Sequence, residues 1–227
     1  MAPTETATGV ARKPGRDAEA TRKAILVAGR AEFAEAGLGG GRIDAIAERA
    51  GCNKAMIYHY FGSKTALFSA VLEHNYALIR QAERALDLDD LPPLEAVRKL
   101  VAFSFDYVRE NPEFIKLINE ENLHGGVHLA GSPTARSLNS PLVGMLREIL
   151  NRGEREGTVR AGVDAQHLYI DIASICYFSV SNRHTLGAIF DLPEGDALLA
   201  ERRTHVIEVI LGYLRPDADF DERTATC

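Results

Sequence analysis

The chain has 227 residues, of which 46% are hydrophobic and 26% charged, as expected for a globular protein of one or two domains. Three cysteines lie far apart and form no Cys-x-x-Cys pair, so neither a zinc site nor a disulfide framework is indicated, and a reducing compartment fits. The net charge of −6 gives no sign of a nucleic-acid partner, and no secretory signal or run of about 18 apolar residues is present. We therefore expect a cytoplasmic protein with no membrane partner.

The charge is unevenly distributed along the chain. Residues 1–72 carry ten basic and seven acidic side chains, whereas the remainder carries sixteen basic and twenty-five acidic ones. A mildly basic N-terminal part on an acidic body is what a module that faces a polyanion would produce.

The first third of the chain predicts a flexible arm followed by four helices. Residues 1–16 form a basic arm rich in Ala, Thr, Pro and Gly, including Arg12 and Arg16. A helix over 18–36 should stop at the glycines of 37–41. Two short helices over 43–50 and 54–61 flank Gly51, and Asn53 should cap the second of them. A fourth helix begins after Ser63 and extends to about residue 86.

The remainder predicts five more helices, so the fold class is all-α with about nine helices. They cover approximately residues 94–110, 112–123, 135–155, 165–190 and 197–214, and residues 216–227 form a disordered tail. We expect an N-terminal domain over 17–63 and a larger helical domain over 64–215.

Two short helices joined by a tight turn that contains glycine are typical of a helix-turn-helix. Apolar residues at helical spacing hold its helices together: Ile43, Ile46, Ala47, Ala50, Ile57 and Phe61. The opposite face of the second short helix carries polar aromatic tips that can bond phosphate, and the small Ala55 allows close approach to a groove. Lys64 begins the next helix, where the dipole favours an anion. The alternative is that Tyr58 or Tyr60 packs against the first helix.

The stretch "IAERAGCNKAMIYHYFGSKTALFSAVL" resembles the TetR family of bacterial transcriptional regulators, over about residues 21–72. The departures are Cys52 for the usual Val, Asn53 for the usual Ser, and Gly41 where a Thr commonly caps the second helix. The resemblance implies a DNA-binding regulator, usually a dimeric repressor of a palindromic operator that a small organic effector releases. The residues it implies at the DNA are Arg42, Asn53, Lys54, Ala55, Met56, Tyr58, His59, Tyr60 and Lys64, with weaker candidates in the arm over 12–16.

The resemblance also implies that the body of the chain dimerises and holds the effector. The predicted dimer residues lie on the last two long helices and are Ile172, Ile175, Phe178, Val206, Ile210 and Tyr213. The predicted effector residues are Phe103, Tyr107, Phe114, Leu117, Ile118, Glu121, His124, His128 and Tyr177. Apolar residues at three-to-four spacing are ordinarily core, and this alternative stays open for both sets.

A metal site is the remaining chemical alternative. Glu121 and His124 are three residues apart, as in di-iron bundles, but those sites need two such motifs and two further carboxylates. We find one, so we predict no metal, no cofactor and no catalytic residue. Two hypotheses remain, a ligand-responsive DNA-binding repressor and an all-helical enzyme or binding protein whose helix-turn-helix is incidental.

Overall fold

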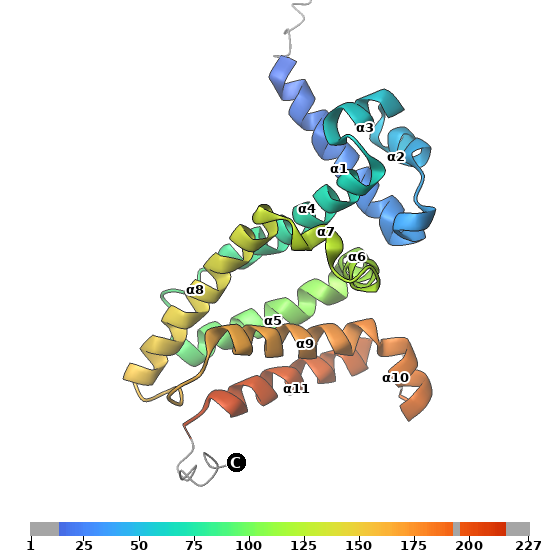
Figure 1. Ribbon diagram of the computed structural model, residues 1–227. Helices are drawn as coiled ribbons and strands as arrows, with labels where there is room; N and C mark the ends of the chain where they lie inside the picture. The colour runs from blue at the N-terminus through green and yellow to red at the C-terminus, as the bar shows by residue number, and fades with distance from the viewer. Residues whose placement is uncertain (1–13, 193–195, 217–227) are drawn as a thin grey trace, which may run out of the picture. The chain divides into compact units, whose positions relative to one another are not determined.

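A computed structural model describes residues 14–192 and 196–216, and the part of the chain that it describes is helical without a strand (Figure 1). The helices are α1 (Pro14–Gly40), α2 (Ile43–Ala50), α3 (Lys54–Phe61), α4 (Lys64–Arg84), α5 (Pro93–Glu110), α6 (Pro112–Leu123), α7 (Val127–Ala130), α8 (Pro133–Arg155), α9 (Ala165–Ser181), α10 (Arg183–Phe190) and α11 (Asp196–Leu214). The predicted all-α class is confirmed. Of the predicted arm, residues 14–16 belong to α1 and residues 1–13 lie outside the described residues, as does most of the predicted tail.

The eleven helices differ from the predicted nine at two places. The predicted helix over 165–190 is broken at Asn182, whose side-chain amide donates to the Phe178 carbonyl and which separates α9 from α10. The predicted loop before α8 contains the single turn α7. This turn forms because Gly125 and Gly126 adopt positive φ angles of 71° and 75°, a conformation that glycine tolerates best.

The first glycine of the Gly37–Gly41 stretch interrupts α1 where the sequence predicts its stop. Gly37 has φ 68° and ψ 176°, outside the helical region, although helical hydrogen bonding continues to Gly40. The amide of Gly41 donates to the Gly37 carbonyl at 3.0 Å, which tightens the chain before it enters α2.

The chain divides into two compact units, residues 1–72 and 73–227. The division lies inside α4, nine residues beyond the boundary that the sequence predicts. The first turns of α4 belong to the N-terminal unit because Leu67, Phe68 and Val71 are buried completely there. The Phe68 ring meets the Phe33 ring of α1 edge-on, with 5.3 Å between centroids.

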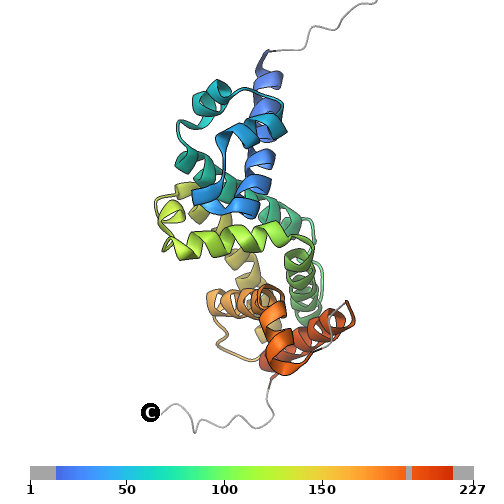
Figure 2. The same cartoon turned by 90° about the vertical axis from the view of Figure 1, so that its right-hand side faces the viewer.

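The second unit is organised around α5, which packs against α8, α9 and α11. Figures 1 and 2 show α9 and α11 side by side beneath α5. The apolar face of α5 is buried, with Val97, Val101 and Phe105 at 0% exposure. Arg203 of α11 donates through Nε to both carboxylate oxygens of Asp106 at 3.0 and 2.9 Å, and this bidentate pair fixes α11 on α5.

Three of the predicted dimer residues are buried by this packing. Ile172, Val206 and Ile210 are 2%, 0% and 2% exposed within the single chain, so they belong to its own core. Because α9 and α11 are apolar on more than one face, periodicity alone does not say which face is internal. Within the described residues no helix is long and apolar enough to cross a membrane.

Candidate nucleic-acid interface and internal cavity

The turn between α2 and α3 is built from a left-handed glycine and an asparagine cap. Gly51 has φ 64° and ψ 31°, and its amide donates to the Glu48 and Ala47 carbonyls that end α2. Asn53 then starts α3, because its Oδ1 accepts the Met56 amide at 3.0 Å. Gly51 therefore ends α2 and Asn53 caps α3, as the sequence predicts.

The start of α2 is held by a buried carboxylate on α1 in place of a side-chain cap. Arg42 occupies the cap position without a capping bond, and its amide donates to Glu32 Oε1 at 2.9 Å. Arg49 at the end of α2 lies 2.7 Å from Glu35 and 3.6 Å from the second oxygen of Glu32. These contacts fix α2 on α1, so no threonine is needed at Gly41.

The outward face of α3 consists of small, aromatic and charged side chains. Ile57 is completely buried and anchors the helix, whereas Ala55, Tyr58 and His59 are exposed, Tyr58 by 48%. Lys54 is exposed and its Nζ lies 2.8 Å from the Asp44 carboxylate of α2. The small Ala55 and the exposed ring of Tyr58 are thus available for contact with another molecule.

Met56 and Tyr60 are half-buried, so they present only part of their side chains. The Tyr60 ring lies beside those of His59 and Phe61, with centroids 5.4 and 6.4 Å apart. The alternative that a tyrosine of α3 packs within the unit therefore applies better to Tyr60 than to the exposed Tyr58.

The remaining predicted DNA residues are Lys64, at the N-terminus of α4, and Arg42, at the N-terminus of α2. Ser63 caps α4 by accepting the Ala66 amide at 3.0 Å. Lys64 is half-buried, and its Nζ donates to the Gly39 carbonyl at 3.0 Å. Arg42 is exposed. The three residues present a hydroxyl and two cations at neighbouring helix ends of the same unit.

The second unit contains a cavity of about 260 Å³ between α4, α5, α6 and α9. Four aromatic rings line it: Tyr76, Phe114, Tyr169 and Tyr177. Three predicted effector residues, Phe114, Ile118 and Tyr177, are among the residues that line it. Phe114 meets Tyr76 edge-on at 5.9 Å between centroids, which defines one wall.

A buried ion pair that the sequence does not predict also lines the cavity. Arg80 and Glu83 are each 3% exposed, and Arg80 Nη1 donates to Glu83 Oε2 at 2.5 Å. Arg80 Nη2 donates to the Tyr169 hydroxyl at 2.8 Å, and the guanidinium lies 5.2 Å from the centre of that ring. The sequence contains one signal for this ion pair. The spacing of Tyr76, Arg80 and Glu83 places two charged side chains on the inward face of α4.

Burial raises the pKa of Glu83 to about 7, because the carboxylate is poorly solvated, and the nearby positive charges of Arg80 and then Arg84 only partly oppose this shift. Burial likewise raises the pKa of the Cys176 thiol, which also lines the cavity, to about 12. Glu83 is therefore the group of this cavity wall whose charge changes near neutral pH.

Six of the predicted effector residues do not line this cavity. Phe103 and Tyr107 lie behind Phe114, since the Tyr107 ring meets that of Phe114 at 5.8 Å and the Phe103 ring at 5.6 Å. Leu117 is completely buried, and His124 is exposed.

Glu121 and His128 form a hydrogen-bond network that holds α7. The buried Glu121 carboxylate accepts the amides of His128 and Leu129 at 2.9 and 3.0 Å, and the His128 ring Nδ1 lies 2.6 Å from its other oxygen. This network occupies the carboxylate that the metal alternative would need. Among the described residues no group of three or more His, Cys, Asp or Glu side chains is placed to hold a metal ion.

A short helix pair with an exposed second helix, followed by a larger helical unit, is the arrangement of a helix-turn-helix regulator. A family model described as bacterial regulatory proteins of the tetR family matches residues 25–71, and a model described as a tetracyclin repressor-like C-terminal domain matches residues 93–210. The chain therefore belongs to the TetR family, which confirms the resemblance drawn from its sequence.

Relatives and solved structures agree with this assignment. The chain is 44% identical to the HTH-type transcriptional repressor NicS of Pseudomonas putida over 88% of its own length and 95% of the relative's. It is 32% identical to the HTH-type transcriptional regulator RutR of Escherichia coli over 69% and 72% of the two chains. A TetR family regulator from Marinobacter aquaeolei superposes with a TM-score of 0.68, covering 90% of this chain and 100% of the other; at 18% identity it supports the fold alone.

The function that follows is regulation of transcription by DNA binding, and the chain is not an enzyme. Of the two hypotheses drawn from the sequence, this outcome confirms the DNA-binding repressor, while its response to a ligand stays a prediction. The individual DNA, effector and dimer residues stay predictions.

Proposed function

We propose that the chain is a homodimeric repressor that binds a palindromic operator in the cytoplasm and releases it when a small organic effector fills the cavity of the second unit. The observation that carries the proposal is the outward face of α3, where Ala55, Tyr58 and His59 are exposed while Ile57 beneath them is completely buried. A rigidly held helix with a small residue and hydrogen-bonding tips suits insertion into a major groove.

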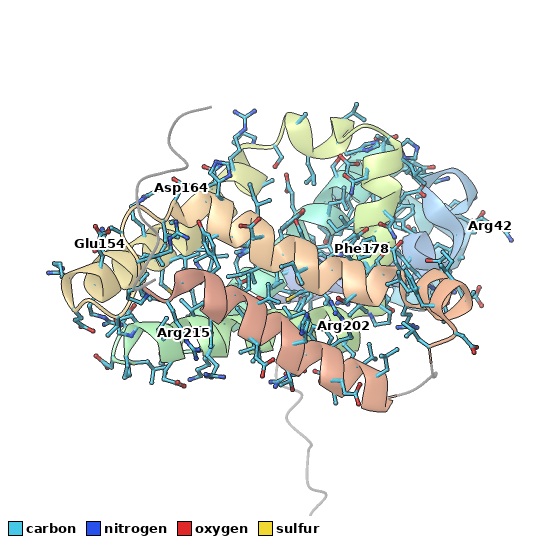
Figure 3. The ribbon with its side chains drawn as sticks, turned by 90° about the horizontal axis from the view of Figure 1, so that it is seen from below. Arg42, Glu154, Asp164, Phe178, Arg202 and Arg215 are labelled. Carbon is cyan, nitrogen blue, oxygen red and sulfur yellow. The ribbon has the colours of Figure 1, made fainter. Side chains whose placement is uncertain are left out.

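Exposed apolar side chains on α9 and α11 support the dimer. Phe178 is 55% exposed, and Val209 and Tyr213 are 43% and 46% exposed, on two helices that lie side by side (Figure 3). Arg202 of α11 donates to the Ser179 hydroxyl of α9 at 3.3 Å, so the two helices form one continuous surface. Paired helix-turn-helix units match the two halves of a palindromic site, and one unit alone binds weakly.

The effector would act through α4. This helix begins with Lys64, a predicted DNA contact, and its later turns carry Tyr76, Arg80 and Glu83, which line the cavity. An effector that binds one conformation of α4 better than another shifts the equilibrium between DNA-binding and released states. A change of about 100-fold in operator affinity needs about 2.7 kcal/mol of differential binding.

The proposal is tested by selecting bound sequences from a random double-stranded DNA pool with the purified full chain. The expected result is an enriched inverted repeat whose affinity falls steeply as salt rises. The matched variant carries Tyr58→Ala and Lys64→Ala together, and it should fold as a dimer and enrich nothing. A folded dimer of the parent chain that enriches no sequence from the pool contradicts the proposal.

A further inference from the structure

The cavity wall contains a cation whose hydrogen-bonding capacity is incompletely used. Arg80 donates through Nη1 to Glu83 and through Nη2 to Tyr169, but its Nε is buried and has no hydrogen-bond partner among the described residues. A guanidinium presents five N–H donors in a fork that matches a carboxylate. Arg80 lines the cavity and has N–H groups beyond those that bond Glu83 and Tyr169, so it can donate to an acceptor that enters the cavity.

The negative charge that balances Arg80 belongs to Glu83, a carboxylate whose ionisation is disfavoured by burial. The charged and titratable groups around Glu83 are Tyr76, Arg80 and Arg84 on its own helix, Asp87 and Asp89 beyond it, Glu148 on α8 and Tyr169 on α9. Because burial raises the pKa of Glu83 to about 7, its carboxyl is neutral in about half of the molecules at neutral pH. In those molecules Arg80 keeps an unbalanced positive charge.

The size and lining of the cavity limit what can enter it. Its volume of about 260 Å³ lies just below the range of roughly 300–1,000 Å³ that is usual for ligand sites. The rings of Tyr76, Phe114, Tyr169 and Tyr177 line it, and flat surfaces of this kind favour a flat ligand. A single aromatic ring with one or two small substituents fits these limits.

We propose that the effector is a small monocyclic aromatic carboxylic acid, whose carboxylate is held by Arg80 and by a hydrogen bond donated from protonated Glu83. The inference rests on the proposed function and names the chemical class of its effector. Binding the anion adds one proton from solvent to Glu83 in each molecule in which that residue was ionised. No covalent bond is made or broken.

A neutral cyclic amide is the competing class, and it predicts the opposite sign. Such a ligand would accept from Arg80 and donate its N–H to ionised Glu83. Its binding would then release protons, and its affinity would increase as the pH rises. The direction of proton transfer on binding therefore separates the two classes even while the natural effector is unidentified.

The test is isothermal titration calorimetry on the full chain with benzoate and the three monohydroxybenzoates, each beside its carboxamide. Each titration is repeated in two buffers of different ionisation enthalpy, which yields the number of protons exchanged. We expect at least one acid to bind with uptake of about 0.5 proton at pH 7 and about 0.9 at pH 8. Its carboxamide should bind at least about ten-fold more weakly, because it lacks the charge that Arg80 recognises.

Variants assign the proton and the charge to their residues. Glu83→Gln should abolish proton uptake and strengthen binding of the acid at pH 8 by about ten-fold, since no proton is then required. Arg80→Gln should weaken binding of the acid by at least about ten-fold and leave the affinity for the carboxamide nearly unchanged. Glu148→Gln removes a carboxylate of the adjoining cavity and should behave as the parent chain.

The inference is overturned if no acid of the panel binds more tightly than about 10 mM, if binding releases protons, or if the carboxamides bind better than the acids. Should a variant fail to fold, the two-buffer experiment on the parent chain still decides the question. Selection from the DNA pool without ligand is run on the same preparation. If DNA binding is intact while every acid fails, this inference alone is wrong; if DNA binding is absent, the proposed function is wrong.

Discussion

A Cβ atom added to Gly41 would lie 2.7 Å from Cδ1 of the Phe33 ring. Real Cβ atoms essentially never approach other atoms so closely, and Phe33 is 1% exposed and wedged against Phe68. The ring therefore cannot move aside without disturbing the core of the N-terminal unit. A residue with a side chain at this position conflicts with the packing.

Gly41→Ala should accordingly destabilise the protein. We expect a loss of about 1–3 kcal/mol, the usual cost of overpacking a well-filled core. Denaturant unfolding followed by circular dichroism measures it. Gly39→Ala is the matched control, because a Cβ there meets nothing within 4 Å, and it should leave stability unchanged or slightly raised. Equal effects of the two substitutions would show that the Phe33 contact is unimportant.

The ion pair between Lys54 and Asp44 predicts a variant with tighter DNA binding. Both side chains are more than half exposed, so their 2.8 Å contact contributes little to stability. Asp44→Asn should remove a negative charge beside the phosphates and release Lys54, raising DNA affinity several-fold at low salt. Fluorescence anisotropy on the selected DNA measures the change.

Glu208→Gln supplies the control for net charge, because Glu208 is an exposed acid on α11 in the second unit. It alters the total charge equally but should change the affinity much less than Asp44→Asn. If Asp44→Asn binds DNA no better than this control, Lys54 does not act at the DNA.

The exposed aromatic ring of Phe178 tests the proposed dimer surface. Phe178→Asp puts a charge where the proposed interface is apolar, and it should weaken dimerisation at least about ten-fold. Sedimentation velocity across a concentration series measures it. Leu123→Asp, at an apolar position 83% exposed on α6, should sediment as the parent does. A fully dimeric Phe178→Asp protein would move the interface to another face.

Glu83 predicts how stability depends on pH. Its pKa is about 7 in the folded chain against an ordinary value of 4.5, so the folded state holds this proton more tightly than the unfolded state does. The resulting stability is complete below about pH 4.5 and is lost as the pH rises through about 7, by up to about 3 kcal/mol.

Denaturant unfolding at a series of pH values, compared with Glu83→Gln, tests this expectation. The glutamine variant keeps the side chain neutral at every pH, so its stability should exceed that of the parent at pH 8 and the two should converge below about pH 4.5. Parallel pH profiles for the two proteins would mean that Glu83 does not titrate in this range.

Local chain signals predict the N-terminal unit well. Gly37, Gly51 and Asn53 act where their backbone preferences indicate, because caps and left-handed turns depend on a few neighbouring residues. The break at Asn182 and the single turn of α7 are not predicted. The first interrupts a continuous apolar pattern, and the second depends on Glu121, a contact that the local sequence does not reveal.

The cavity is harder to predict because it depends on how helices distant in sequence come together. Aromatic and apolar content alone identifies Phe114, Ile118 and Tyr177 among the lining residues. The same reasoning overlooks Arg80 and Glu83, because charged residues on a helix ordinarily face solvent. It also assigns Ile172 and Val206 to a partner surface, because an apolar pattern predicts burial without saying against what.

The most direct test of the account is the footprint and stoichiometry of the full chain on its selected DNA. We predict two chains per duplex and two symmetric protected regions centred about 34–36 Å apart, as required by a two-fold pair of α3 helices in successive major grooves. Saturation by one chain, or a single protected half-site without symmetry, would contradict the dimeric repressor.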